Sequence, residues 1–378
     1  MKYMGSKRSM LSNGLGETLL REIATSRRFA DLFLGSSAVA WHVAENFGCS
    51  VIGADLQTFA VILAEAVIAR DKPLASKEIW DRWSADARKM VLGSHFYYEA
   101  EVFDRVEWAA ARRRNVEAAR NICQHHNGPV TRAYGAHYFS PMQALVLDSL
   151  RVTAPRDPIH RKVALAALIC AASQCAASPG HTAQPFQPTV GAARFLFEAW
   201  RRDVWEHTRS ALERICPKHA RSVGSAKVED AESFAKQLGP EDLAFVDPPY
   251  SGVHYSRFYH VLETVARGDC DEVSGVGRYP PPSERPKSDF SISTKSKQAL
   301  ERLLSILAER GVRTIVTFPR EETSNGLSGS IVEDVAHEYF KVSKRTTNGR
   351  FSTLGGNLVH RQARIPAYEV ILSLSPRN

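Results

Sequence analysis

The sequence predicts an α/β protein with a doubly wound, mainly parallel sheet and a mostly helical inserted domain. Residues 1–72 alternate short apolar strands with helical patterns, and residues 226–378 do so again. Residues 73–225 are mainly helical in pattern and rich in Trp, Arg and Ala. We therefore expect one domain from residues 1–72 and 226–378, and a helical insertion at 73–225.

The first strand and helix of the predicted sheet are joined by small residues. Residues 28–33 form a short apolar strand, Leu34-Gly35-Ser36-Ser37 form a turn, and residues 38–47 have helical spacing. Small residues at such a turn let a ligand approach the backbone closely. A second strand at 50–54 ends in Asp55, about 20 residues after the turn, where an acid can accept both hydroxyls of a ribose. The pair predicts a nucleoside site, with an ordinary parallel-sheet turn as the alternative.

The inserted region contains an arginine run with two interpretations. Ala109 to Asn115 includes three consecutive arginines, which could grip phosphates or read guanine edges, or could form an exposed helix face. The alanine-rich stretch from Val163 to Ala177 is too short to span a bilayer and predicts a packed helix. The basic N-terminus lacks a following apolar core, so we expect no signal peptide and a cytoplasmic protein.

A buried strand at Leu243 to Val246 delivers Asp247-Pro248-Pro249-Tyr250 to its exit. The carboxylate and a proline carbonyl can accept hydrogen bonds from an amino group, and the tyrosine ring can stack on the flat ring that carries it. The prolines fix the backbone that presents the carbonyl. This tetrapeptide predicts a site for modifying an amino group on a planar base, and a plain strand-to-turn exit is the alternative.

The residues after the tetrapeptide are aromatic and basic. Ser251 to His260 suit a loop that closes over an extruded base, although Phe258 and Tyr259 could instead pack a helix at 260–266. Residues 267–294 lack periodicity and contain three consecutive prolines, so we expect a mobile surface loop there.

The C-terminal part continues the sheet pattern. Residues 299–309 predict a helix that Gly311 ends, and residues 313–318 predict a strand. The final strand, 367–374, is expected to pair antiparallel at or near a sheet edge. Residues 341–364 are basic and predict either a hairpin facing a polyanion or a solvated surface.

Composition favours a polyanionic partner. The chain has 378 residues, and 49 Lys and Arg against 41 Asp and Glu give a net charge of +8. A basic balance fits DNA better than an acidic small molecule, although a solvated surface could carry the same charge. The six cysteines show no regular spacing, so we expect reduced, buried thiols and no metal site.

Several motifs follow one another in an informative order. They are Lys2-Tyr3-Met4-Gly5-Ser6-Lys7-Arg8, Asp31-Leu32-Phe33-Leu34-Gly35-Ser36-Ser37, Asp55, Val228-Glu229-Asp230-Ala231 and Asp247-Pro248-Pro249-Tyr250. In this order the chain resembles the Dam-like, alpha-group DNA adenine N6-methyltransferases. The matching motifs cover roughly the first 70 residues and the stretch from 226 to 260.

The resemblance implies a Rossmann-like methyltransferase fold, S-adenosylmethionine as cofactor and no metal. The catalytic residues it implies are Asp247, Pro248, Pro249 and Tyr250. The cofactor-binding residues it implies are Tyr3, Met4, Gly5, Lys7, Asp31, Phe33, Gly35, Ser36, Ser37, Asp55, Asp230, Ala231 and Asp247. The family usually has glycine where this chain has Ser37, which leaves less room for the cofactor there.

The resemblance also implies a site-specific enzyme that methylates adenine N6 in duplex DNA by base flipping and direct transfer. The inserted domain would read the target, and a restriction endonuclease would be the cognate partner of a monomeric enzyme that binds no membrane. Methylation of cytosine N4, RNA adenine or a protein glutamine is an alternative, and Asp247 favours adenine because the cytosine and glutamine families tend to have Ser or Asn there. A catalytically silent DNA-binding specificity subunit is the other alternative. The sequence does not predict the recognised DNA site.

Overall fold

The computed structural model describes residues 7–105, 107–108, 111–351 and 365–377, and the chain divides into two compact units. The sheet unit consists of Tyr3–Lys72, Lys218–Ser256 and Pro286–Asn378. The helical unit contains Pro73–Pro217 and Arg257–Arg285. The division differs from the predicted boundaries mainly at residues 257–285, which belong to the helical unit although they follow the predicted active-site strand.

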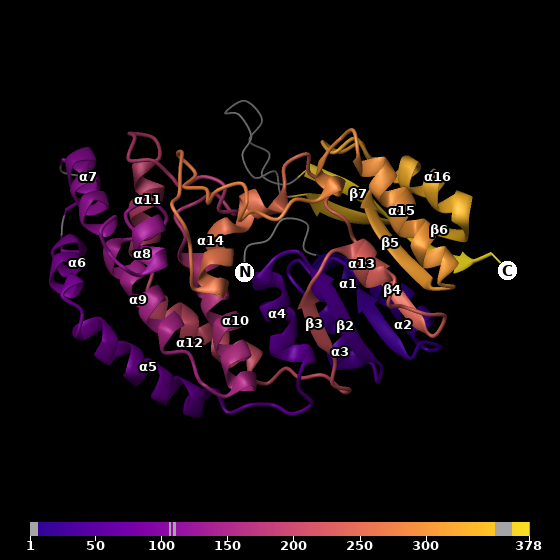
Figure 1. The fold of residues 1–378 in the computed structure, drawn as a ribbon, viewed down its shortest axis with the longest axis horizontal. Coiled ribbons are helices and arrows are strands. Elements are labelled where there is room, and N and C mark those ends of the chain that lie inside the picture. The colour runs from indigo at the N-terminus through magenta and orange to yellow at the C-terminus, as the bar shows by residue number, and fades with distance from the viewer. Residues whose placement is uncertain (1–6, 106, 109–110, 352–364, 378) are drawn as a thin grey trace. The chain divides into compact units, whose positions relative to one another are not determined.

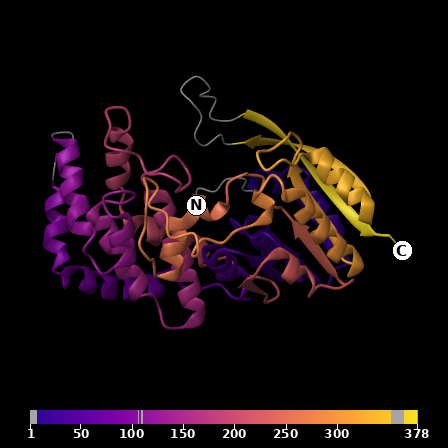
Figure 2. The same cartoon turned by 45° about the horizontal axis from the view of Figure 1, so that its top comes forward.

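Within the described residues, the sheet unit contains a seven-stranded sheet in the order β3-β2-β1-β4-β5-β7-β6 (Figures 1 and 2). The strands are β1 (Arg28–Asp31), β2 (Ser50–Asp55), β3 (Ser225–Val228), β4 (Asp242–Val246), β5 (Arg313–Pro319), β6 (Phe340–Phe351) and β7 (Ile365–Pro376). Neighbours from β3 to β5 are parallel, and β7 is antiparallel to both β5 and β6. The predicted mainly parallel sheet and the antiparallel final strand are confirmed.

Strand β1 lies between β2 and β4, and this position creates the crevice where ligands bind in such sheets. The chain passes from β1 to β2 on one side, and β4 and β5 continue the sheet on the other. The crevice lies at the carboxyl ends of the strands where the order reverses. Asp31, Asp55 and Asp247 each end or follow one of these strands, so the topology brings the three predicted acids to one edge.

Helices cover both faces of the sheet. Helix α3 (Ala38–Asn46) packs on β1 and β2, and α4 (Thr58–Ile68) packs on β2 and β3. Helices α1 (Arg8–Leu11) and α2 (Leu15–Ile23) belong to the same unit. The helices α13 (Ala231–Ala235), α15 (Ser296–Glu309) and α16 (Gly329–Tyr339) share a hydrophobic core with the sheet. Strand β4 is buried throughout, as expected for a central parallel strand.

The buried Asp242 at the start of β4 is matched by a cation. Arg28 donates two hydrogen bonds to the Asp242 carboxylate, both of 2.7 Å. The main-chain N–H of Gly239 donates a third, of 2.9 Å. This pairing lets an acid begin an otherwise apolar strand.

The helical unit confirms the helical character predicted for residues 73–225. Its helices are α5 (Ser76–Leu92), α6 (Phe96–Asp104), α7 (Arg112–Cys123), α8 (Pro129–Tyr134), α9 (Pro141–Val152), α10 (Pro158–Cys175), α11 (Ala193–Trp200), α12 (Val204–Ile215) and most of α14 (Tyr255–Arg267). Ser140 and Gln143 form a capping box that fixes the start of α9. The predicted packed helix is α10, and among the described residues no helix is long and apolar enough to cross a membrane.

Two predictions about residues 267–311 had different outcomes. Helix α15 ends at Glu309, and Gly311 follows it with a φ of +68°, as predicted. The prediction of a mobile surface loop at 267–294 was wrong for its end, because Phe290 and Ser291 are buried in a short 3-10 helix, η1 (Asp289–Ser291). Phe290 packs edge-on against Phe33 with ring centroids 5.3 Å apart, a contact that periodicity cannot predict.

Candidate functional site

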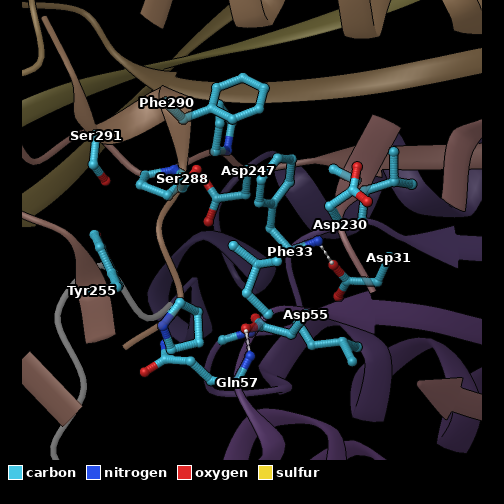
Figure 3. Close-up of a pocket in the computed structure, with 18 of the residues that line it drawn as sticks. Asp31, Phe33, Asp55, Gln57, Asp230, Asp247, Tyr255, Ser288, Phe290 and Ser291 are labelled. Carbon is cyan, nitrogen blue, oxygen red and sulfur yellow. Dashed lines mark hydrogen bonds between the residues drawn. The ribbon is translucent and has the colours of Figure 1, made fainter. Parts of the chain in front are cut away.

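A cavity of about 360 Å³ opens at the carboxyl ends of β1, β2 and β4 and lies entirely within the sheet unit (Figure 3). Its volume falls in the range of roughly 300 to 1,000 Å³ that is typical of small-molecule sites. We call the part around Gly35, Asp55 and Gln57 the turn end, and the part around Asp247 and Tyr250 the tetrapeptide end. Residues 286–291, predicted to be a surface loop, also line the cavity.

At the turn end, main-chain N–H groups hold Asp55. Gly35 donates a 2.9 Å hydrogen bond to Asp55 Oδ2, and Gln57 donates one of the same length to Oδ1. Gly35 has a φ of +47°, which glycine adopts without a steric cost. A carboxylate has about four lone-pair sites, so the two N–H groups are compatible with further hydrogen bonds from a ligand's hydroxyl groups.

Ser37, which the resemblance implies as a cofactor-binding residue, lies behind the cavity wall. It is fully buried and is absent from the cavity lining, whereas its neighbour Ser36 lines the cavity. The Ser37 hydroxyl donates a 3.2 Å hydrogen bond to the Ala60 carbonyl in α4. Its φ of +58° lies in the left-handed region, which glycine adopts more readily than serine.

Asp31 brings a buried carboxyl group to the cavity. It ends β1, is 2% exposed, and accepts a 3.2 Å hydrogen bond from the N–H of Phe33. Burial raises the pKa of Asp31 to about 8, and this hydrogen bond only partly opposes the shift. Such a group favours a ligand that brings a positive charge.

Asp230 lies at the start of α13, where its exposed side chain lines the cavity. Its Oδ1 accepts a 2.9 Å hydrogen bond from the N–H of Ser233 and so caps the helix. Burial raises the pKa of Asp230, but hydrogen bonds at the helix start outweigh it and lower the pKa overall. Ala231 lines the cavity beside it.

At the tetrapeptide end, side chains from distant segments hold Asp247. Lys7 Nζ lies 3.0 Å from Asp247 Oδ1 and 2.8 Å from Glu369 Oε2. Thr317 of β5 donates a 2.9 Å hydrogen bond to Asp247 Oδ1. The Lys7 side chain is 3% exposed, so this cluster places a buried cation between two carboxylates.

The electrostatics of this cluster favour an ionised Asp247 at neutral pH. Burial raises the pKa of Asp247 to about 6, while Lys7 and the Thr317 hydroxyl lower it and Glu369 raises it. Burial lowers the pKa of Lys7, but the two carboxylates outweigh this effect and raise its pKa above the usual range. Asp247 can therefore accept hydrogen bonds as a carboxylate.

The rest of the tetrapeptide is fixed by a buried amide. Asn325 donates hydrogen bonds from Nδ2 to the carbonyls of Pro249, at 2.8 Å, and Phe290, at 2.9 Å. Tyr250 lines the cavity with its ring perpendicular to that of Tyr255, with centroids 6.4 Å apart. Lys7 Nζ lies 5.8 Å from the Tyr250 ring centroid, close enough for a cation–π contact.

The structure gathers most of the predicted site residues around one cavity. They are Lys7, Asp31, Phe33, Gly35, Ser36, Asp55, Asp230, Ala231 and Asp247 to Tyr250. Tyr3, Met4 and Gly5 lie outside the described residues.

Sequence reasoning missed Glu369, Thr317, Asn325 and Phe290. Only Glu369 carries a signal in the sequence, because it is the single charged residue in the mostly apolar stretch from Pro366 to Leu374. A charge at the start of a buried strand indicates a buried partner. The other three depend on contacts between segments far apart in the chain.

Comparison with known proteins gives a family and two curated relatives. The model of the D12 class N6 adenine-specific DNA methyltransferase family matches residues 3–315. "Modification methylase LlaI" of Lactococcus lactis subsp. lactis is 24% identical over 313 residues, which are 80% of this chain and 43% of that protein. "Type II methyltransferase M.FokI" of Planomicrobium okeanokoites is 23% identical over 281 residues, 73% of this chain and 38% of that protein. The chain thus spans less than half the length of either relative.

Proposed function

Because this chain belongs to the D12 class N6 adenine-specific DNA methyltransferase family, we propose that it methylates adenine N6 in DNA, with S-adenosylmethionine as methyl donor. The observation that carries the proposal is the exit of β4, where Asp247 to Tyr250 line the cavity. These residues bring together a carboxylate, a rigid backbone and an aromatic ring. The two relatives named as a modification methylase and a methyltransferase support the same chemistry.

The cavity lining suits this donor, which carries a nucleoside and cationic groups. Asp55 at the turn end is oriented by two main-chain N–H groups, and a carboxylate is a suitable acceptor for the ribose hydroxyls. Burial raises the pKa of both Asp31 and Asp247, so a cationic ligand would favour their ionised forms. When bound, the donor supplies an electrophilic methyl group, and the protein has only to supply alignment and charge stabilisation.

Asp247 and Pro248 act on the amino group. The N6 lone pair is delocalised into the adenine ring, and hydrogen bonds to the Asp247 carboxylate and a proline carbonyl favour a more tetrahedral, nucleophilic nitrogen. The Pro249 carbonyl already accepts a hydrogen bond from the Asn325 amide, so we assign the second hydrogen bond from N6 to the Pro248 carbonyl. Asp247 need not remove a proton before attack, because the proton becomes acidic once the nitrogen carries the methyl group.

Tyr250 holds the base by stacking, since chemistry on a base requires its extrusion from the duplex. We assign target reading to the helical insertion predicted at residues 73–225. Arg113 and Arg114 are exposed at the start of α7 and are available to phosphates. We further propose that the protein acts as a monomer in the cytoplasm and that a cognate restriction endonuclease accompanies it.

The test is transfer of label from tritiated S-adenosylmethionine to unmethylated genomic DNA or total RNA, followed by digestion to nucleosides. We expect label in N6-methyladenosine of DNA, lost in Asp247→Asn and retained in Asp81→Asn. Asp81 is a matched control because its carboxylate pairs with Lys77 on the exposed face of α5. Label in N4-methylcytosine or in RNA would change the substrate, and donor binding without transfer would indicate a silent subunit.

A further inference from the structure

The cluster around Lys7 has an excess of negative charge. Lys7 Nζ contacts Asp247 at 3.0 Å and Glu369 at 2.8 Å, and the Asp247 and Glu369 side chains are 16% and 10% exposed. With all three groups ionised, two carboxylates share one ammonium group. A buried pair of Lys7 and Asp247 alone would be neutral, so Glu369 changes the charge that the site presents.

We propose that Glu369 is a positioning residue of the transfer site. Its carboxylate balances the positive charge of Lys7, so that Lys7 holds Asp247 in place without neutralising the Asp247 carboxylate. This inference rests on the proposed function, in which Asp247 faces the adenine amino group. Positive charge develops on N6 as it accepts the methyl group. A carboxylate with net negative surroundings stabilises that charge more than one cancelled by an adjacent ammonium group.

The sheet topology explains why Glu369 can reach this place. In the register of β5 and β7, Glu369 lies opposite Pro319, the last residue of β5. Because β7 runs antiparallel, its early residues lie at the edge where the parallel strands end. Glu369 therefore meets the exit of β4, although 122 residues separate it from Asp247 in the numbering (369 − 247).

Lys7 and Glu369 act on the ionisation of Asp247 in opposite directions. Beyond burial, which has the largest effect, Lys7 lowers the pKa of Asp247 and Glu369 raises it. Among the described residues, the charge of Asp247 also couples to Asp31 at the end of β1 and to Tyr255 at the start of α14. These two are unchanged in Lys7 and Glu369 variants, so any shift reports the cluster.

The experiment measures the pH dependence of single-turnover methyl transfer in the wild type, Lys7→Met and Glu369→Gln. Transfer requires ionised Asp247, so its rate rises with pH through the pKa of Asp247. We expect this acidic limb to move up by about one pH unit in Lys7→Met and down in Glu369→Gln. At its plateau, Glu369→Gln should be slower by about tenfold, because its Asp247 is neutralised by Lys7. Glu369→Asp should move the limb back towards the wild type.

A second measurement keeps the inference separate from the proposed function. The ¹³C carboxyl signal of Asp247, assigned by its loss in Asp247→Asn, gives the pKa without any turnover. Opposite shifts of this pKa in the two variants support the charge arrangement even if no adenine is methylated. A lack of adenine methylation would contradict the proposed function alone.

The control is Arg28→Met, which removes a cation from the mostly buried Asp242 in the same unit. It should lower stability and leave the acidic limb in place. The inference is overturned if the acidic limb of the pH profile moves in the same direction in Lys7→Met and Glu369→Gln, or moves in neither variant. Transfer by Glu369→Gln at the wild-type plateau rate also overturns it.

Discussion

At the turn end of the cavity, two main-chain N–H groups hold Asp55, whereas at the tetrapeptide end side chains of Lys7 and Thr317 hold Asp247. The first arrangement is local, because Gly35, Asp55 and Gln57 come from neighbouring strand ends. The second gathers residues from the start, middle and end of the chain and buries charge. The difference teaches that, under the proposed function, binding of the donor would depend on backbone shape and reaction with the base on long-range electrostatics.

The largest effect is expected from Asp247→Asn at the tetrapeptide end. The amide cannot offer a carboxylate charge to the N6 amino group, so methyl transfer should slow by about 10²- to 10³-fold. Donor affinity should fall far less than the rate, because the turn end is intact and only the attraction of the Asp247 charge for the cationic donor is lost. Single-turnover transfer and equilibrium donor binding measure the two quantities. A loss of affinity equal to the loss of rate would contradict the separation of the two ends.

Asn325→Leu should destabilise the protein and misplace the tetrapeptide. It leaves the carbonyls of Pro249 and Phe290 without their amide donor, at a cost of about 3 kcal/mol in the free energy of unfolding. Urea unfolding measures this, and transfer by the folded fraction should fall as well. Asn325→Asp, which keeps the shape but not the donor, is the matched comparison. Full activity in both variants would show that Asn325 is not needed to position the tetrapeptide.

Asp55→Asn tests the turn end. The N–H groups of Gly35 and Gln57 would lose a charged acceptor, and we expect donor affinity to fall by about tenfold. The rate of transfer at saturating donor should stay within a few-fold of the wild type. Binding calorimetry and single-turnover kinetics separate the two. A rate defect at saturation would show that the turn end also shapes the reacting geometry.

Asp31 should make donor binding release a proton. Its pKa of about 8 leaves it mostly protonated at pH 7, and a cationic donor favours the ionised form. About one proton per donor should therefore be released, and affinity should rise with pH towards 8. Calorimetry in phosphate and Tris counts the protons, and Asp31→Asn should release none from this site. Equal heats in both buffers for the wild type would contradict this.

The smallest effect is expected from Ser37→Gly. Glycine relieves a left-handed φ at a gain of about 1 kcal/mol but loses the hydrogen bond to Ala60, so the free energy of unfolding should change by less than about 1 kcal/mol. Donor affinity should remain unchanged, because Ser37 is outside the cavity lining. Thermal unfolding and donor titration check both. A large gain in affinity would restore the idea that serine crowds the ligand.

The parts of the site that the sequence predicted are those written in contiguous motifs. The turn after β1, Asp55 and the tetrapeptide each follow a recognisable strand, and the topology brings them together. The ion cluster could not be predicted, since Lys7 and Glu369 meet only through an antiparallel strand whose register no motif encodes. Phe290 was assigned to a surface loop because a single buried aromatic residue creates no periodic pattern.

The link between Lys7 and Glu369 has a consequence for the protein during its synthesis. A nascent chain that has exposed the turn and the tetrapeptide still lacks β7, so Lys7 can contact Asp247 but has no Glu369 to meet. The cluster is completed only after β7 has left the ribosome and inserted between β5 and β6. Translation therefore delays the mature charge balance of the site until β7, which is made after the other six strands of this sheet, has folded.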